Sequence, residues 1–349
     1  MSISKESILK VASMAVVTLG LIFFAHNMTE DKNMALYDFC MGTSASVHIN
    51  GEASGDKLAR EIIDEIKKLD SEIISWRTED SELSRLNKGY KAGETYYVSE
   101  ELRYAIEESL RLCEDSGGAV DITLRPVLGL WGIEDKSEED FEPPAEDELR
   151  ELKDIIGYEN VHVSLDGVTV DKADMILDFG ATGKGYALDI AKKRLEEAHA
   201  KSALVSVGGS ILIYGNKEND TPWRVGIRNP KGTQEDMLGY LEMQGEDGIC
   251  ISTSGDYEKY IEKDGIRYHH IIDRRYLAPA KTDITGLAGV TVVCRSGIDS
   301  DGLSTACFVL GEKASRDLLK KYDAEAIFID RDNNISMTDG LKDYFKYQK

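Results

Sequence analysis

A glycine-rich stretch in the middle of the chain has the residue types best suited to binding a phosphate. It runs from Asp178 to Asp189, reads DFGATGKGYALD, and joins a short apolar run to the helical pattern at 186–200. Where a strand turns into a helix, backbone N–H groups and the positive end of the helix dipole attract anions. A tight connection whose glycines only supply positive φ angles is an equally good explanation. The spelling fits neither a P-loop nor the dinucleotide fingerprint.

Two oxygen-bearing side chains further along the chain suit a divalent cation. Asp301 and Thr305 are four residues apart in a stretch, 299–306, that opens a predicted helix. Residues at this spacing face the same side of a helix, and carboxylate and hydroxyl oxygens are hard ligands. The alternative is that Asp301 caps the helix and Thr305 is buried, although Asp299 or Ser300 would cap it equally well.

A candidate base and a candidate carboxylate follow one another near residue 270. His269, His270 and Asp273 lie in a strand-like segment, where His269 and His270 point to opposite faces, so at most one of them shares a face with a site. A structural role is the alternative for each histidine. No Gly-x-Ser-x-Gly motif occurs in the sequence, and no cysteine has local acid-base neighbours, which argues against covalent hydrolase chemistry. The residues alone therefore indicate a metal-assisted site for a phosphorylated ligand.

The charge of the chain restricts its partners. The 349 residues carry a formal charge of −22, and lysine and arginine are scattered. This balance argues against nucleic acid or anionic lipid as the main partner. An acidic protein that binds a phosphorylated ligand must neutralise it locally, and a divalent cation does so most simply. The five cysteines have no CxxC spacing, which favours neither a zinc site nor a disulfide framework.

The N-terminus indicates where the protein acts. Lys5 and Lys10 precede an uncharged run at 11–25, and Glu30 and Asp31 follow it. Such a run is a cleavable signal peptide or an uncleaved anchor, and the lysines leave its N-terminal end in the cytoplasm. We expect residues 1–33 to be this segment with a linker and residues 34–349 to form one domain outside. A buried helix is the alternative.

The remaining elements predict an α+β fold with a mixed, largely antiparallel sheet and flanking helices. Helical spacing appears at 56–74, 99–113, 148–156 and 186–200. Asp166-Gly167 predicts a type I′ hairpin turn, and the acidic segment 134–147 is expected to be solvated. Trp76, at a helix end, is either a core anchor or a stacking ring. The predicted strands are 34–49, 203–207, 211–214, 223–227, 238–243, 249–252, 289–294, 326–329 and 335–337.

Together, several motifs in a fixed order resemble the ApbE family, the flavin transferases that move FMN from FAD onto a protein. The resemblance covers residues 41–311 and rests on the segments 41–43, 81–87, 117–126, 130–132, 178–189, 208–209, 253–257, 270–273 and 301–305. It implies the ApbE fold, FAD as substrate, Mg²⁺ as cofactor, and an acceptor protein with a Thr or Ser hydroxyl as partner.

The resemblance also implies roles for individual residues. Those expected to hold the flavin or the nucleotide are Met41, Trp76, Ala119, Val120, Asp121, Asp178, Lys184 and Ile272. Those expected to hold Mg²⁺ are Ala181 through its carbonyl and Asp301 and Thr305 through their side chains. Removing the Asp301 side chain is then expected to abolish Mg²⁺-dependent turnover and leave the fold intact.

The implied reaction is attack of the acceptor hydroxyl on the FMN-side phosphorus of FAD, which releases AMP, with His270 or Asp273 as the base. One departure affects this loop. After Asp273 the family usually has a Pro-x-Thr/Ser-Gly turn, whereas this chain has Arg274 to Leu277, so the turn chemistry is lost and the loop is expected to be rebuilt. An FAD pyrophosphatase and a non-catalytic FAD-binding carrier remain as alternative functions.

Overall fold

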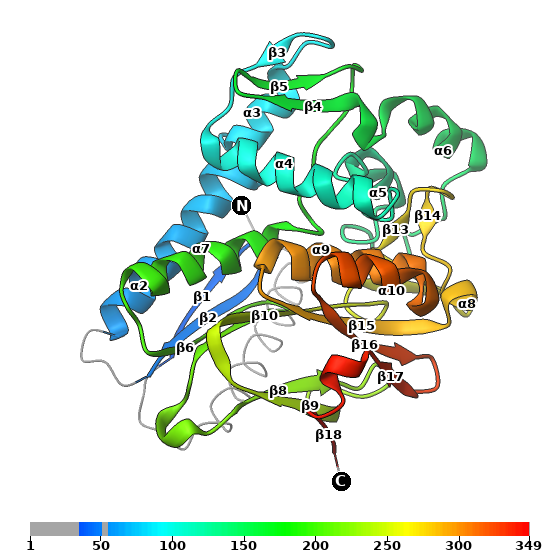
Figure 1. Cartoon of the computed structure of the whole chain (residues 1–349). Coiled ribbons are helices and arrows are strands. Elements are labelled where there is room, and N and C mark those ends of the chain that lie inside the picture. The colour runs from blue at the N-terminus through cyan, green and yellow to red at the C-terminus, as the bar shows by residue number, and fades with distance from the viewer. Residues whose placement is uncertain (1–34, 51–54, 349) are drawn as a thin grey trace, which may run out of the picture.

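An eight-stranded sheet forms the centre of the computed structural model, which describes residues 35–50 and 55–348 (Figure 1). All strand pairs described are antiparallel, so the predicted fold class is confirmed. In spatial order the strands are β1 (Leu36–Cys40), β2 (Thr43–Ile49), β6 (Ser202–Val207), β7 (Ser210–Gly215), β10 (Gly245–Gly255), β15 (Leu287–Cys294), β16 (Glu325–Asp330) and β17 (Ile335–Met337).

Helices cover one face of this sheet. They are α2 (Gly55–Lys68), which continues into a π-helical turn (Leu69–Ile74), α7 (Gly183–Glu197), α9 (Gly297–Leu310) and α10 (Glu312–Lys321). The apolar stripe of α2, with Ile62 and Ile66, is buried as its spacing predicts, whereas α9 is buried on almost every side. Burial of these apolar side chains holds the helices on the sheet.

A small antiparallel sheet covers the opposite face. It contains β18 (Phe345–Tyr347), β9 (Met237–Met243) and β8 (Trp223–Arg228). Trp223, Leu241 and Phe345 pack against the underside of the large sheet, around Ile213 and Ile327. The large sheet is therefore the middle of three layers.

The remaining elements lie mostly beyond the helical layer (Figure 1). The helices are α3 (Glu82–Gly89), α4 (Glu100–Asp115), α5 (Arg125–Trp131), α6 (Glu146–Leu152) and α8 (Thr282–Thr285), with short 3₁₀ turns at 153–155, 158–160, 218–220 and 339–341. The strands are β3 (Thr95–Tyr96), β4 (Val161–Ser164), β5 (Gly167–Val170), β11 (Tyr260–Lys263), β12 (Ile266–His269), β13 (Ile272–Asp273) and β14 (Ala278–Pro279).

The predicted type I′ turn of the hairpin at 161–170 differs from the turn in the structure. The hairpin at 161–170 forms, but Leu165 and Asp166 make its turn and Gly167, with φ 138°, begins β5, so the predicted type I′ turn is wrong. Positive φ angles at both turn positions occur instead at Asp264 and Gly265, between β11 and β12.

Within the described ranges no helix is long and apolar enough to cross a membrane. The predicted signal or anchor segment lies outside the described residues.

Helices α7 and α9 touch backbone to backbone at two glycines. A Cβ on Gly185 would lie 2.1 Å from the carbonyl oxygen of Gly297, and one on Gly297 would lie 2.2 Å from that of Gly185. Close by, the Asp189 carboxylate accepts hydrogen bonds from the Gly297 and Ile298 N–H groups, at 2.6 and 2.8 Å. Asp189 therefore satisfies two donors that the start of α9 would otherwise leave unpaired.

This contact predicts a large effect of one methyl group. Gly185→Ala should lower the free energy of unfolding by about 1–3 kcal/mol or more, because the new Cβ overlaps a backbone atom that cannot move away alone. Gly129→Ala is the matched control, since Gly129 lies in α5 with nothing within 4 Å of its Cβ position. The control should stabilise the protein slightly. Urea unfolding of both variants measures this, and equal stability of the two would contradict a tight helix crossing.

Candidate functional site

Asp301 links three elements at the centre of the candidate site. It lies in the second turn of α9, and its residue is only 3% exposed. One carboxylate oxygen accepts the Gly185 N–H at 3.0 Å, and the other accepts the Ser210 hydroxyl at 3.2 Å and lies 3.5 Å from the Lys184 ammonium. Ser296 caps α9 by accepting the Asp299 N–H at 3.2 Å, so the capping interpretation of Asp301 is wrong.

The buried contacts of Asp301 revise one expectation. Without its carboxylate, the Gly185 N–H and the Ser210 hydroxyl each lose an acceptor, and a buried polar group left without a partner costs about 1–3 kcal/mol. Asp301→Ala is therefore expected to destabilise the fold, in contrast to the intact fold expected from the sequence.

The predicted magnesium ligands provide the oxygens that such an ion needs. Thr305 follows Asp301 by one turn of α9 and shares a 3.1 Å hydrogen bond with the Ser254 hydroxyl. Ala181 lies in the tight turn before α7, where the Phe179 carbonyl accepts the Gly183 N–H at 2.7 Å. Mg²⁺ typically takes one or two carboxylates and completes its shell with water and substrate phosphate. The donor set therefore fits Mg²⁺, although in the described ranges no three His, Cys, Asp or Glu side chains form a metal cluster.

One of the predicted flavin residues, Met41, lies against the start of α7. Met41 forms the turn between β1 and β2 with φ 54°, and its terminal methyl is 3.4 Å from the Cβ position of Gly183. The guanidinium carbons of Arg125 and Arg77 lie 3.4 and 4.3 Å from the centre of the half-buried Trp76 ring. Cations at this distance are attracted to the ring face.

Glu134 joins this region to His270, and sequence reasoning missed it. Its side chain is 25% exposed and pairs with Arg77 at 2.9 Å and with Lys259 at 2.6 Å. Burial raises the pKa of Glu134, but Lys259 and Arg77 outweigh that effect and lower it to about 2. The expectation that the whole segment 134–147 is solvated is wrong at Phe141, which is fully buried, and the Glu134 side chain is only partly exposed. The only signal in the sequence is that Glu134 lies two residues after the motif at 130–132.

The two histidines have different environments. His269 is buried and bonds the Ala280 carbonyl through Nε2 at 2.9 Å, which is a structural role. The half-buried His270 bonds the Lys259 carbonyl through Nδ1 at 3.2 Å. Because a carbonyl only accepts, Nδ1 carries the proton, and Nε2 is left able to take one. Desolvation, followed by Lys259, lowers the pKa of His270 to about 4, so the ring is neutral at pH 7.

Asp273 is a weaker candidate for the base. Its buried carboxylate accepts from the Arg275 side chain through Nε at 2.9 Å and Nη2 at 2.8 Å, and from the Arg275 N–H at 2.9 Å. The Tyr276 N–H bonds the Asp273 carbonyl at 3.1 Å, and Leu277 has φ 52°. The segment thus forms a compact turn between β13 and β14, and the prediction that its turn chemistry is lost is wrong.

The nucleotide residues predicted near Asp121 lie close to this turn. The Asp121 carboxylate accepts from Thr123, through the N–H at 2.8 Å and the hydroxyl at 2.6 Å, and lies 3.2 Å from Arg274 Nε. Arg274 also pairs with Glu159, so it binds its own chain. Desolvation raises the pKa of Asp121.

Three other residues predicted to contact the nucleotide or FAD are buried. Ala119 and Val120 are buried beside Asp121, and Ile272 packs in the core around Trp131.

Asp178 accepts the Gly180 N–H at 2.7 Å and shapes the turn before α7. Burial raises the pKa of Asp178, and the nearby Arg125 charge opposes the change. The structure therefore brings Lys184, Asp301 and Met41 together around the start of α7. Trp76 and His270 are linked to one another through Arg77, Glu134 and Lys259.

Comparison with known proteins decides the family. Residues 41–328 match the model of the ApbE family. The chain belongs to the ApbE family. It is 34% identical over 289 residues to the FAD:protein FMN transferase of Treponema pallidum (strain Nichols), covering 78% of this chain and 76% of that protein. With the FAD:protein FMN transferase of Vibrio cholerae (O395) it shares 29% identity over 309 residues, covering 87% and 88%.

Solved structures of ApbE proteins have the same fold. The ApbE protein from Thermotoga maritima superposes with a TM-score of 0.78 and 29% identity, over 91% of this chain and all of that chain. The apo form of the flavinyl transferase ApbE from Pseudomonas stutzeri gives 0.76 and 29%, over 91% and 98%. The resemblance inferred from the motifs is confirmed, and the relatives from Treponema pallidum, Vibrio cholerae and Pseudomonas stutzeri are named for flavin transfer.

The charge network around Glu134 predicts a pH-dependent stability. Because the pKa of Glu134 is lowered, its pairs stabilise the fold above the ordinary value of about 4.5 and are lost as the pH falls through about 2. Glu134→Gln should therefore cost about 1–3 kcal/mol at pH 7, and the difference from the wild type should shrink towards pH 2. Urea unfolding at pH 7, 4.5 and 3 measures it. Glu138→Gln, at an exposed position of the same segment, is the control, and an equal effect of both substitutions would refute the network.

Proposed function

We propose that this protein is a Mg²⁺-dependent FAD:protein FMN transferase that attaches FMN to a Thr or Ser hydroxyl of an acceptor protein and releases AMP. The observation that carries the proposal is the buried Asp301 carboxylate, held beside Lys184 and the start of α7 with Thr305 one turn away. These groups supply an anion site and a cation site next to one another, as a pyrophosphate requires. Membership of the ApbE family, whose relatives are named FAD:protein FMN transferases, supports FAD as the substrate.

Each side chain has a separate task in this mechanism. Lys184 and the positive end of the α7 dipole would attract and orient the pyrophosphate, since the N–H groups of Gly183 and Gly185 already bond the Phe179 carbonyl and the Asp301 carboxylate. Asp301, Thr305 and the Ala181 carbonyl would hold Mg²⁺, which would neutralise charge on the phosphoryl oxygens. Trp76 and Met41 would contact the isoalloxazine ring. In an acidic chain, these few local groups determine where the anion binds.

His270 is the proposed base. The acceptor oxygen forms a bond to the FMN-side phosphorus, the bond from that phosphorus to the AMP oxygen breaks, and the hydroxyl proton moves to Nε2 of His270. The Nδ1 bond to the Lys259 carbonyl fixes the tautomer that this step needs. Asp273 is less suited to the step because Arg275 holds both of its oxygens.

We also propose that residues 1–33 take the domain to the extracytoplasmic face of the membrane, where it is anchored or released. The charge pattern around the uncharged run at 11–25 supports this. Protease treatment of spheroplasts should digest the protein, whereas protection until the cells are lysed would contradict export.

Mass spectrometry of an acceptor domain tests the transfer. The full chain in detergent is incubated with FAD, Mg²⁺ and a flavin-accepting domain with one candidate Thr. A mass gain equal to FMN minus water, with AMP in solution, is expected. Free FMN with an unmodified acceptor across a panel of domains would instead indicate a pyrophosphatase. No consumption of FAD would indicate a carrier.

The role of His270 has its own test. His270→Ala should lower the rate of transfer by about 10²- to 10⁴-fold, because the proton loses its acceptor. Burial lowers the pKa of the His270 ring to about 4. The ring therefore stays neutral between pH 6 and 8 and should cause no change in kcat/KM for the acceptor there, whereas kcat/KM should fall below about pH 5 as the ring takes up a proton. His162→Ala, at an exposed position of β4, should have no effect. An active His270→Ala protein together with an inactive Asp273→Asn protein would transfer the role to Asp273.

A further inference from the structure

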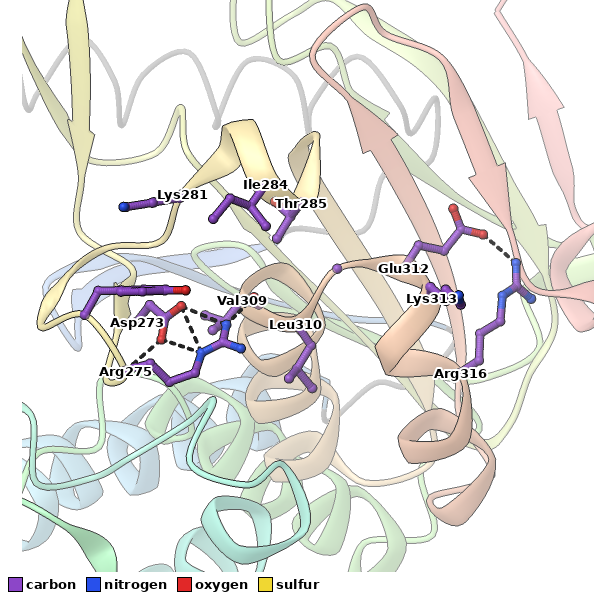
Figure 2. Close-up of a pocket in the computed structure, with 12 residues that line it drawn as sticks. Asp273, Arg275, Lys281, Ile284, Thr285, Val309, Leu310, Glu312, Lys313 and Arg316 are labelled. Atoms are coloured by element: carbon purple, nitrogen blue, oxygen red, sulfur yellow. Dashed lines mark hydrogen bonds and ion pairs between the residues drawn. The ribbon is translucent and has the colours of Figure 1, made fainter.

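A groove of about 450 Å³ opens beside Asp273 and is not used by any step above (Figure 2). Its walls are the turn after β13, the short helix α8, and the end of α9 with the start of α10. Figure 2 shows Asp273 and Arg275 facing one another by Val309 at the end of α9, while Lys281 and Ile284 extend from the opposite wall.

The groove has an excess of positive charge in a chain of net charge −22. Four lining residues are basic and two are acidic. The two carboxylates are already neutralised, because Asp273 pairs with Arg275 at 2.8 Å and Glu312 pairs with Arg316. Lys281 and Lys313 are exposed, and the ion pairs of the described residues include neither of them. The groove therefore presents two ammonium groups to a ligand.

Apolar side chains lie on the same walls. Tyr276 is 48% exposed and Ile284 is 68% exposed, although both are large. The Lys281 ammonium lies 4.9 Å from the centre of the Tyr276 ring, so a charge and an apolar surface adjoin. Such a combination suits a peptide that carries both acidic and apolar side chains.

Two elements connect the walls of the groove with residues of the proposed reacting centre. Asp273 follows His270 by three residues, a span of at most about 10 Å along the chain. Val309 follows Thr305 by four residues, so the two face the same side of α9 about 6 Å apart. An extended chain rises about 3.3 Å per residue, so about three to five residues connect a peptide in the groove with the phosphorus.

We propose that this groove docks the acceptor protein through acidic and apolar residues that lie three to five positions from its Thr or Ser. The inference rests on the proposed transferase function and adds to it the chemistry of the partner. Lys281 and Lys313 attract the acidic side chains, and Tyr276 and Ile284 contact the apolar ones. The groove thereby selects which hydroxyl enters the site, whereas FAD binds independently of it.

A double charge reversal tests the proposal in the full-length protein. Lys281→Glu/Lys313→Glu is compared with Lys57→Glu/Lys68→Glu, which makes the same change of charge at exposed positions of α2, on the other side of the molecule. The probe is an acceptor domain that the wild type flavinylates. The groove variant should raise KM for the acceptor by about tenfold or more and leave KM for FAD within about twofold, because rim charges act on the partner that they face. The α2 variant should match the wild type.

A charge swap on the acceptor completes the test. Replacing the acidic residues near its Thr with lysine should impair transfer by the wild type and restore transfer by the groove variant. Equal KM values for the groove and α2 variants would refute the groove while the transferase function stands. A higher KM for FAD alone would assign the groove to the nucleotide and also refute the proposal. Failure of the wild type to modify any acceptor would remove the transferase function and this inference with it.

Discussion

The backbone contact between Gly185 and Gly297 determines the geometry of the site. It brings α7 and α9 so close that the Gly185 N–H bonds the Asp301 carboxylate, and Asp189 on α7 bonds the first N–H groups of α9. The helix end that attracts an anion and the carboxylate that attracts a cation are therefore fixed relative to one another. A side chain larger than hydrogen at either glycine separates them.

The proposed binding of a pyrophosphate by this acidic protein depends on a few local charges. The positive groups near the site are few, and each has a defined contact: Lys184 lies beside Asp301, Arg125 lies over Trp76, and Lys259 is held by Glu134. The Lys259 carbonyl in turn sets the tautomer of His270. Glu134 thus acts on the proposed base through Lys259 without contacting the substrate.

The sequence predicts those helices and strands that depend on local residue patterns. The strands of the central sheet and the helix at 99–113 follow from apolar alternation and helical spacing, and the structure confirms both. Glu134 and the Arg274–Asp121 pair could not be predicted, because each depends on a contact between distant segments. The cap at Ser296 is local, but Asp299, Ser300 and Asp301 shortly after it are equally suitable capping residues by type. The turn after Asp273 forms with unusual residues because the Asp273 side chain bonds the Arg275 N–H. The order of the motifs predicted the family, whereas the residues alone left metal binding and capping open for Asp301.

The most direct test of the account is the position of a divalent cation in crystals grown with Mn²⁺ and FAD. The anomalous signal of Mn²⁺ should lie within about 2.5 Å of the Asp301 carboxylate and the Thr305 hydroxyl. It should disappear in an Asp301→Asn protein that otherwise superposes on the wild type. A cation bound elsewhere, with Asp301 contacting only Lys184, Gly185 and Ser210, would contradict the claim that the helix crossing presents this carboxylate to the metal.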